Sequence, residues 1–391
     1  MKQFYLAKRK LQFVPAATIL VALAISASTA AQNITTFEAP GAGTAALQGT
    51  YATGIDPTGA IAGFSRDANN ARHGFIRSRD GGFTIFDAPG AGTGNFQGTR
   101  AYAISPSGIV TGFFVDSVNA AHGYVRSSKG VITIIDAPGA GTGPFPEGTF
   151  ITSPLEINSN GTIAGYYNDS AQVGHGFLRD KNGNFTTFDA PGAGTEAGQG
   201  TFSFAISPVG EVTGFYFDAA LASHGFLLDK NGVITSYDVP GSGTGVFQGT
   251  YGGGFTPNGN IMGNYVDAND VSHGFVMDRR TGTFTTYDAP GAGTGALQGT
   301  YPFGINTAGT ISGWYVDASD VSHGFVRDRH GAITEFDVPG AGTGPFQGPN
   351  VYGIAPNGAV TGFYFDADYV VHGFVREGNG GGLSSLKSRG H

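Results

Sequence analysis

Hydrophobic residues recur along this chain in short alternating runs, each bounded by Gly, Pro, Asn or Asp. In the segment that begins at Thr300, four such runs cover residues 300–306, 310–317, 323–328 and 332–337. Runs of this length, rich in β-branched and aromatic residues, predict four β-strands joined as a meander. We call them strands a, b, c and d in chain order. Neighbouring aromatic residues in strand b, such as Trp314 and Tyr315, point to opposite faces, so we expect both faces of the sheet to be buried.

The four-strand pattern occurs seven times. Each copy carries a histidine at the start of strand c, and successive histidines lie 49, 53, 49, 49, 50 and 49 residues apart. A period near 50 residues is typical of propellers and solenoids, and it has to be interpreted before any local motif. Seven equivalent copies indicate a structural module rather than a single catalytic motif.

The two ends of the repeated region indicate how the copies close. Residues 34–38 match strand d of the other copies, whereas the last copy stops after strand c at Arg376. We therefore predict an all-β fold, a seven-bladed β-propeller of four-stranded antiparallel blades, with the N-terminal strand 34–38 completing the last blade. Ring closure removes exposed sheet edges. A solenoid would instead need capping repeats, and the sequence has none.

The first 31 residues differ from the rest. Four basic residues precede an apolar run from Leu11 to about Ile25 and then a stretch of small residues, which predicts a secretory signal peptide over 1–31. The alternative is an uncleaved N-terminal anchor, although the run is shorter than the ~20 residues of a membrane span. The propeller is expected over 32–377, followed by a polar, Gly-rich, disordered tail over 378–391. We expect a secreted or periplasmic bacterial protein that has no membrane span once the signal peptide is cleaved.

Composition and charge narrow the function classes. With 67 glycines but 12% aromatic residues, the chain does not resemble a disordered or collagen-like protein. Loss of the four basic residues in 1–31 would leave 17 Lys and Arg against 29 Asp and Glu, a net charge of −12. Such a surface repels nucleic acid and anionic lipid. The chain has no cysteine, so stability must come from packing and ring closure. We expect a monomer without a cofactor.

An aspartate precedes each repeated histidine by six residues, so the two residues flank the loop between strands b and c. Because imidazole and carboxylate are common metal ligands, a metal site or an acid–base pair is one interpretation. Because the pair occurs in seven identical copies, we favour the other interpretation, in which a structural Asp–His hydrogen bond forms in every blade and no metal is bound. The pairs are Asp67–His73, Asp116–His122, Asp169–His175, Asp218–His224, Asp267–His273, Asp317–His323 and Asp366–His372.

The second repeated loop follows strand d and contains Pro-Gly-Ala-Gly-Thr or a close variant. It lacks the lysine of a phosphate-binding loop and no helix follows it, so we interpret its glycines as permitting a tight crossing between blades. The b–c and d–a connections emerge on the same end of a blade and are the long ones here. We expect that face to carry the function.

One position after this loop varies between copies. Aromatic rings at a propeller mouth suit the apolar faces of sugars, and a glutamine nearby in most copies offers amide hydrogen bonds; the alternative is that the rings pack between blades. The candidate rim consists of Tyr51, Arg100, Phe150, Phe202, Tyr251, Tyr301 and Asn350. Unique polar residues are Arg100, Glu147, Glu156 and His330. Glu147 and Glu156 belong to the third copy, which is four residues longer than most.

The consensus of each copy, with Gly304-Ile305-Asn306 and a His-Gly-Phe triplet at most histidines, resembles bacterial extracellular repeats of the HAF type. The resemblance covers residues 34–376 and implies an exported repeat protein, but it supplies no catalytic residues. No catalytic motif stands out. We therefore expect a non-enzymatic propeller that binds an extracellular glycan or another surface partner through its long-loop face. The alternatives are an extracellular polysaccharide lyase or glycoside hydrolase, and a structural cell-surface repeat protein.

Overall fold

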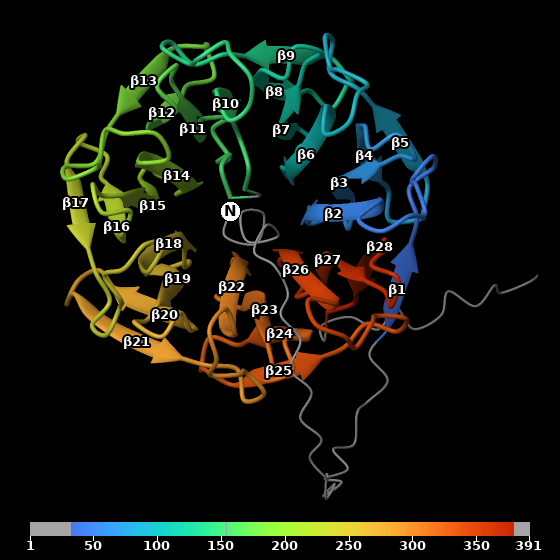
Figure 1. Ribbon diagram of the computed structural model, residues 1–391. Helices are drawn as coiled ribbons and strands as arrows, with labels where there is room; N and C mark the ends of the chain where they lie inside the picture. The colour runs from blue at the N-terminus through green and yellow to red at the C-terminus, as the bar shows by residue number, and fades with distance from the viewer. Residues whose placement is uncertain (1–32, 154, 379–391) are drawn as a thin grey trace, which may run out of the picture. The chain divides into compact units, whose positions relative to one another are not determined.

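The computed structural model describes residues 33–153 and 155–378. All its strands lie in the unit that begins at Ile34. Figure 1 shows them as blades around a common centre, with strand a of each blade innermost and strand d at the outside. Within each blade the strands pair in the order a, b, c, d, and every pair is antiparallel. The predicted seven-bladed, four-stranded β-propeller is confirmed.

The bounds of the strands follow the predicted runs. The inner strands a are β2 (Gly49–Ile55), β6 (Gly98–Ile104), β10 (Gly148–Phe150), β14 (Gly200–Ile206), β18 (Gly249–Phe255), β22 (Gly299–Ile305) and β26 (Gly348–Ile354). Strands b are β3 (Ile61–Arg66), β7 (Val110–Val115), β11 (Ile163–Asn168), β15 (Val212–Phe217), β19 (Ile261–Val266), β23 (Ile311–Val316) and β27 (Val360–Phe365). Strands c are β4 (Arg72–Arg77), β8 (Ala121–Arg126), β12 (Gly174–Arg179), β16 (Ser223–Leu228), β20 (Ser272–Asp278), β24 (Ser322–Arg327) and β28 (Val371–Arg376). Strands d are β5 (Phe83–Phe86), β9 (Ile132–Ile135), β13 (Phe185–Phe188), β17 (Ile234–Tyr237), β21 (Thr283–Tyr287), β25 (Ile333–Phe336) and β1 (Ile34–Phe37).

The ring closes through β1, the first strand of the chain, which forms the outer strand of the last blade. It pairs with β28 from Ile34 opposite Arg376 to Phe37 opposite Gly373 (Figure 1). Phe37 packs against the first blade, with its ring centroid 6.4 Å from that of Phe75. The closing strand therefore joins the two ends of the ring both by backbone pairing and by core packing.

The His-Gly-Phe triplet is explained by the interior of each blade. Its aromatic residue is fully buried in every copy, as Phe275 is, and full burial of such a side chain contributes about 1.5–3 kcal/mol. In six of the seven copies its glycine makes room for an aromatic residue of strand d, and in the second blade Gly123 lies opposite Ile135. A Cβ on Gly274 would lie only 2.5 Å from the ring of Tyr287. The histidine, in contrast, lies at the rim.

The third blade departs from the others, as its longer sequence predicts. Its inner strand β10 has only three residues, and the following segment runs into the centre of the ring. Leu155 packs against the core of the fifth and sixth blades, and its carbonyl accepts a hydrogen bond from Ile206 N–H at 2.9 Å. The axial space left there is a small cavity of about 60 Å³, lined by Leu155, Tyr352 and inner-strand residues such as Ile305. The insertion thus plugs the axis.

Other predictions fall on parts of the chain that are not described. The predicted signal peptide, 1–31, and all but the first residue of the predicted tail, 378–391, lie outside the described residues. Among the described residues, no helix is long and apolar enough to cross a membrane.

Candidate functional site

The long-loop face is built from two loops of every blade, the b–c loop and the d–a loop that leads into the next blade. In each blade, the backbone N–H of a d–a loop residue donates to the carbonyl of a b–c loop residue, with N···O distances between 2.7 and 3.1 Å. The donor and acceptor pairs are Leu47–Tyr369, Phe96–Asn70, Phe145–Asn119, Gly198–Gln172, Phe247–Leu221, Leu297–Asp270 and Phe346–Asp320. The face is therefore a hydrogen-bonded ring of loops.

Backbone strain is concentrated in the same loops. All twelve non-glycine residues with positive φ among the described residues are members of these pairs, for example Phe96 (φ 64°) and Asn70 (φ 65°). The left-handed region costs an L-residue about 1–2 kcal/mol. The paired loops hold these residues there, and strain of this kind is often found at functional surfaces.

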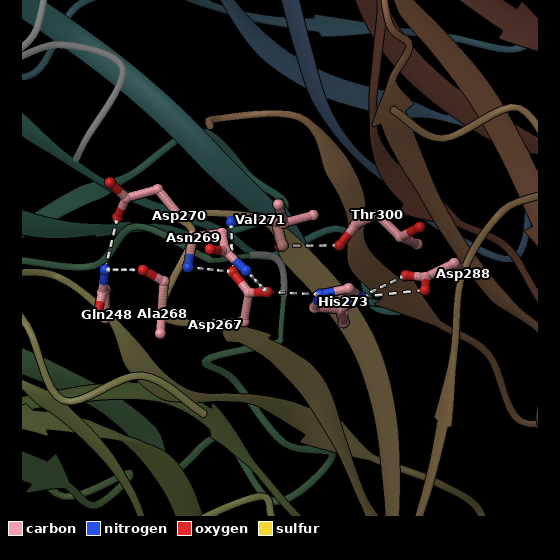
Figure 2. A network of polar contacts seen from close by, with 10 residues as sticks. Gln248, Asp267, Ala268, Asn269, Asp270, Val271, His273, Asp288 and Thr300 are labelled. Carbon is pink, nitrogen blue, oxygen red and sulfur yellow. Dashed lines mark hydrogen bonds and ion pairs between the residues drawn. The ribbon is translucent and has the colours of Figure 1, made fainter. Parts of the chain in front are cut away.

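The glutamines near the rim are used to tie the two loops together. Gln248 Oε1 accepts the Gly245 N–H at 2.9 Å, while its Nε2 donates to the Ala268 carbonyl at 3.3 Å and to Asp270 Oδ1 at 3.2 Å (Figure 2). In the third blade, Glu147 replaces the glutamine and accepts the N–H of Gly143 at 2.7 Å. These amides are engaged within the loops, so they are not open donors for a sugar.

Each repeated histidine contacts two carboxylates rather than one. In the fifth blade, His273 Nδ1 lies 3.0 Å from both carboxylate oxygens of Asp288, and Nε2 lies 3.8 Å from Asp267 Oδ2 (Figure 2). The Asp267 Oδ1 atom accepts the backbone N–H of Asn269 at 2.8 Å and of Val271 at 2.9 Å. The aspartate thus shapes the b–c loop with one oxygen and faces the histidine with the other.

The seven predicted Asp–His pairs all meet within ion-pair distance, at 3.1–3.8 Å between Nε2 and Oδ2. The closer partner is a second carboxylate, from the residue that follows strand d, which sequence reasoning missed. The second contacts are His73–Asp87, His122–Asp136, His175–Asp189, His224–Asp238, His273–Asp288, His323–Asp337 and His372–Glu38. We call each set of one histidine and two carboxylates a histidine clamp.

The electrostatics of the clamps match their geometry. The hydrogen bond to Asp288, opposed by partial burial, raises the pKa of His273, and Asp87 does the same for the pKa of His73. In six blades the imidazole also stacks on a strand-b ring, as His273 does on Tyr265 at 4.9 Å. Across residues 33–153 and 155–378, no group of three or more His, Asp or Glu side chains is arranged to hold a metal ion.

The candidate rim residues lie beneath the long loops, at the start of the inner strands. Arg100, Phe150, Phe202 and Asn350 are buried, and Tyr51, Tyr251 and Tyr301 are half-buried. The three tyrosine hydroxyls donate to the carbonyl of the residue four positions earlier, as Tyr251 does to Phe247 at 2.8 Å. Stacking explains the burial, since rings of strands a and b alternate around the axis. Tyr51 lies 4.7 Å from Phe64 and 4.9 Å from Phe363.

Inside this belt of rings lies a buried carboxyl group. Glu156, on the plug, is fully buried and accepts the backbone N–H groups of Thr152 at 2.5 Å and Ser153 at 2.6 Å on Oε2. Its Oε1 has no hydrogen-bond partner among the described residues. Burial, only partly offset by the two backbone hydrogen bonds, raises the pKa of Glu156 well above its usual range.

The exposed aromatic side chains distinguish the two faces. Every exposed aromatic residue among those described lies in a long loop, and these residues are Phe96, Phe145, Phe346 and Tyr369. The opposite, short-turn face carries a depression of about 610 Å³ between the fourth and fifth blades, lined by Tyr237, Met277 and Phe284 among others. An ion pair between Arg279 and Glu211, at 2.8 Å, lies beside it. The last unique polar residue, His330, is exposed on this face.

Comparisons with known proteins extend only to the fold. No protein-family model and no curated protein matches this chain. Among solved structures, puromycin hydrolase matches with a TM-score of 0.47 at 11% identity over 84% of this chain, which spans 53% of the hydrolase. The BP39L lectin of Burkholderia pseudomallei matches with a TM-score of 0.43 at 14% identity, covering 84% of this chain and 95% of the lectin. The six-bladed, fucose-recognising lectin of Aleuria aurantia matches with a TM-score of 0.40 at 10% identity, over 73% and 96%. The chain is similar to these proteins in its propeller fold.

Proposed function

We propose that this protein is an exported, non-enzymatic β-propeller that binds an extracellular glycan through its long-loop face. The observation that carries the proposal is the position of the exposed aromatic side chains, which in the described part of the chain all lie in the long loops. Phe96, Phe145 and Phe346 are 51%, 57% and 53% exposed. A rigid aromatic ring presented to water by a strained, hydrogen-bonded loop is suited to stacking on a sugar ring, because its geometry is fixed before binding.

Repetition supports a binding role. The d–a loops that carry Phe96, Phe145 and Phe346 are held in the same way, since each makes the same backbone hydrogen bond to the b–c loop. Several equivalent contacts on one rigid face allow a repeating ligand to be bound at more than one blade, which raises the overall affinity without new contacts.

A lyase or glycoside hydrolase needs a carboxyl group that reaches its substrate. Glu156 has a strongly raised pKa, but its side chain is fully buried, and its two nearest partners are backbone N–H groups. The histidine clamps repeat in every blade and serve the loops. Neither feature supports catalysis, so binding is the function that the site supports best.

The test is a glycan-array screen of residues 32–391, with product release from the same polysaccharides followed in parallel. We expect binding without products. A variant with Phe346→Ser and Tyr369→Ser should lose most of its binding, whereas Val131→Ser with Val209→Ser should not. Val131 and Val209 are 65% and 68% exposed in the short turns, so they control for loss of surface hydrophobicity. Release of products would contradict the proposal, and so would equal loss in both variants.

A further inference from the structure

Three arginines meet where the sevenfold pattern of the long-loop face is broken. Arg66 ends β3 and Arg72 begins β4 in the first blade, and Arg100 lies near the start of β6 in the second. All three converge on Phe96 in the d–a loop between these blades. Its ring centroid lies 4.8 Å from the Arg66 guanidinium carbon and 5.1 Å from that of Arg72. Its carbonyl accepts a hydrogen bond from Arg100 Nη2 at 2.9 Å.

The other blades carry no charge at these positions. Arg66 corresponds to Val115, Asn168, Phe217, Val266, Val316 and Phe365, and Arg72 corresponds to Ala121, Gly174, Ser223, Ser272, Ser322 and Val371. The counterparts of Arg100 are Tyr, Phe or Asn. The fold therefore does not need cations here, because six blades are built without them.

The three positive charges are buried without a counter-charge. Arg66, Arg72 and Arg100 are only 8%, 7% and 8% exposed. None of them forms an ion pair with a carboxylate among residues 33–153 and 155–378; Asp67, which directly follows Arg66, faces His73 instead. Burial of a charge is costly unless the charge is paired.

Hydrogen-bond donors are left over in the same cluster. Arg66 Nε, Arg72 Nη1 and Arg100 Nη1 are buried and have no acceptor among the described residues. Burial, reinforced by repulsion from the neighbouring arginines, lowers the pKa of Arg72 to about 9. Burial also lowers the pKa of Arg100 to about 10. A group with several negatively charged oxygens would supply both the charge and the acceptors that are missing, because guanidinium groups bind carboxylate and sulfate through paired hydrogen bonds.

We propose that Arg66, Arg72 and Arg100 form an oxyanion-binding site that receives the carboxylate or sulfate of an acidic sugar beside Phe96. Phe96, which is 51% exposed, lies against the guanidinium groups of Arg66 and Arg72, so its exposed ring can stack on the sugar whose acidic group reaches the arginines. This site would explain how part of the proposed glycan ligand is recognised. The assignment of a sugar as the ligand rests on the proposed function, whereas the assignment of an anion rests on the arginines alone. Because the chain is acidic overall, with a net charge of −8, the preferred ligand carries an isolated or terminal acidic residue rather than a polyanion.

The repeats themselves supply the variant that tests this site. Arg66→Val, Arg72→Ser and Arg100→Tyr together install residues that other blades already carry at these positions, so the variant should fold. The tyrosine can also donate to the carbonyl of residue 96, as Tyr251 does to Phe247. Arg79→Ser removes one exposed cation from the short-turn face, so it is the control for loss of a positive charge away from the site.

The first measurement is the thermal midpoint in sodium sulfate and in sodium chloride at equal ionic strength. Sulfate should raise the midpoint of the wild type and of Arg79→Ser by several degrees more than that of the triple variant, because only an occupied native site adds stability. Without sulfate, the triple variant should be at least as stable as the wild type. Equal responses to sulfate in all three proteins would overturn the proposal.

The second measurement compares binding to glycans that end in a uronic acid or a sulfated sugar with binding to their neutral counterparts. The triple variant should lose about tenfold or more in affinity for the acidic glycans, in line with the loss of charged hydrogen bonds. Unchanged binding by the triple variant would refute the anion site and leave the proposed glycan function intact. A sulfate response in the wild type without glycan binding would instead support the anion site and refute the proposed function.

Discussion

Gly249 lies at the seam between the fourth and fifth blades, and its replacement by alanine tests how tightly the ring is assembled. The residue has φ +112°, and a Cβ there would lie 2.0 Å from the carbonyl oxygen of Ser223. The strands β16 and β18 meet at these two residues, and Ser223 N–H donates to the carbonyl of Gln248 at 2.7 Å. Equivalent glycines occupy all seven seams, with a close carbonyl oxygen at 1.9–2.1 Å in each.

The expected cost of Gly249→Ala has two parts. The positive φ costs about 1–2 kcal/mol for an L-residue. Moving the Ser223 backbone to relieve the clash adds about 1–3 kcal/mol, typical of overpacking, and weakens a hydrogen bond worth about 1 kcal/mol. The total loss in the free energy of unfolding is therefore about 3–6 kcal/mol.

Gly241→Ala separates the two parts. Gly241 also has positive φ, at +94°, but a Cβ there would meet nothing within 4 Å. This variant should lose only the conformational cost, about 1–2 kcal/mol. Both can be measured by urea denaturation, with the fluorescence of Trp314, the single tryptophan, which is 8% exposed, as the probe. Equal losses in the two variants would refute the idea that close approach between blades requires glycine at the seam.

Three further predictions concern the plug, the clamps and the closing strand. Because its folded-state pKa is raised, the carboxyl of Glu156 stabilises the fold below its unfolded pKa, and that stability is lost as the pH rises through the folded value. Glu156→Gln should therefore have a higher free energy of unfolding than the wild type at pH 8, and this difference should be smaller at pH 5. Asp288→Asn should lower the pKa of His273 while leaving the other clamp histidines unchanged, as measured by NMR titration. Phe37→Ala should cost about 3–5 kcal/mol and speed amide hydrogen exchange in β28.

Each of these has a contrary outcome. A stability difference between Glu156→Gln and the wild type that does not vary with pH would show that the carboxyl is not the titrating group. If the His273 pKa did not move in Asp288→Asn, the contact to Asp288 would not be its cause. Phe188 holds the place of Phe37 in the third blade and packs against Phe226 of the fourth, away from β28. Faster exchange in β28 after Phe188→Ala as well would therefore show that closure is not the reason.

The raised histidine pKa values also predict how the wild type responds to pH. A histidine whose folded pKa lies above its unfolded value of about 6.5 stabilises the protein below that value, and the stability is lost as the pH rises through the folded pKa. His73, His122, His273 and His323 all have raised pKa values for the same reason, a hydrogen bond to the carboxylate after strand d. The thermal midpoint should therefore fall as the pH rises from about 6 to 8. A midpoint that rose over this range would contradict the account.

The fold could be predicted from the sequence because every blade packs the same kinds of residues at the same positions, so the pattern repeats seven times. The period, the turn residues and the match of residues 34–38 to strand d together determine the number of blades and the closing strand. The second carboxylate of each clamp was also predictable. Strands c and d pair with Gly74 opposite Phe86, so His73 and Asp87 are cross-strand neighbours. Working out the register between strands c and d from the sequence would have revealed the contact between the histidine and the carboxylate after strand d.

The arginine cluster could not be found in this way. Arg66, Arg72 and Arg100 come from three strands of two blades, and their sequence separation follows no repeat. Only the packing of the second blade against the first brings them to Phe96. The burial of Phe150 and Phe202 likewise depends on packing between blades, because Phe150 packs on Phe113 of the second blade and Phe202 packs on Tyr166 of the third.

The plug changes how stability is shared around the ring. In a simple repeat array, each module contacts only its two neighbours, so energetic coupling decays along the series. Here Leu155 ties the third blade to the fifth and sixth, and Phe204 contacts Phe303, two blades away, with ring centroids 5.3 Å apart. These contacts couple blades that are not neighbours, so destabilising one blade also destabilises blades on the far side of the ring. The blades should therefore unfold as a single cooperative unit.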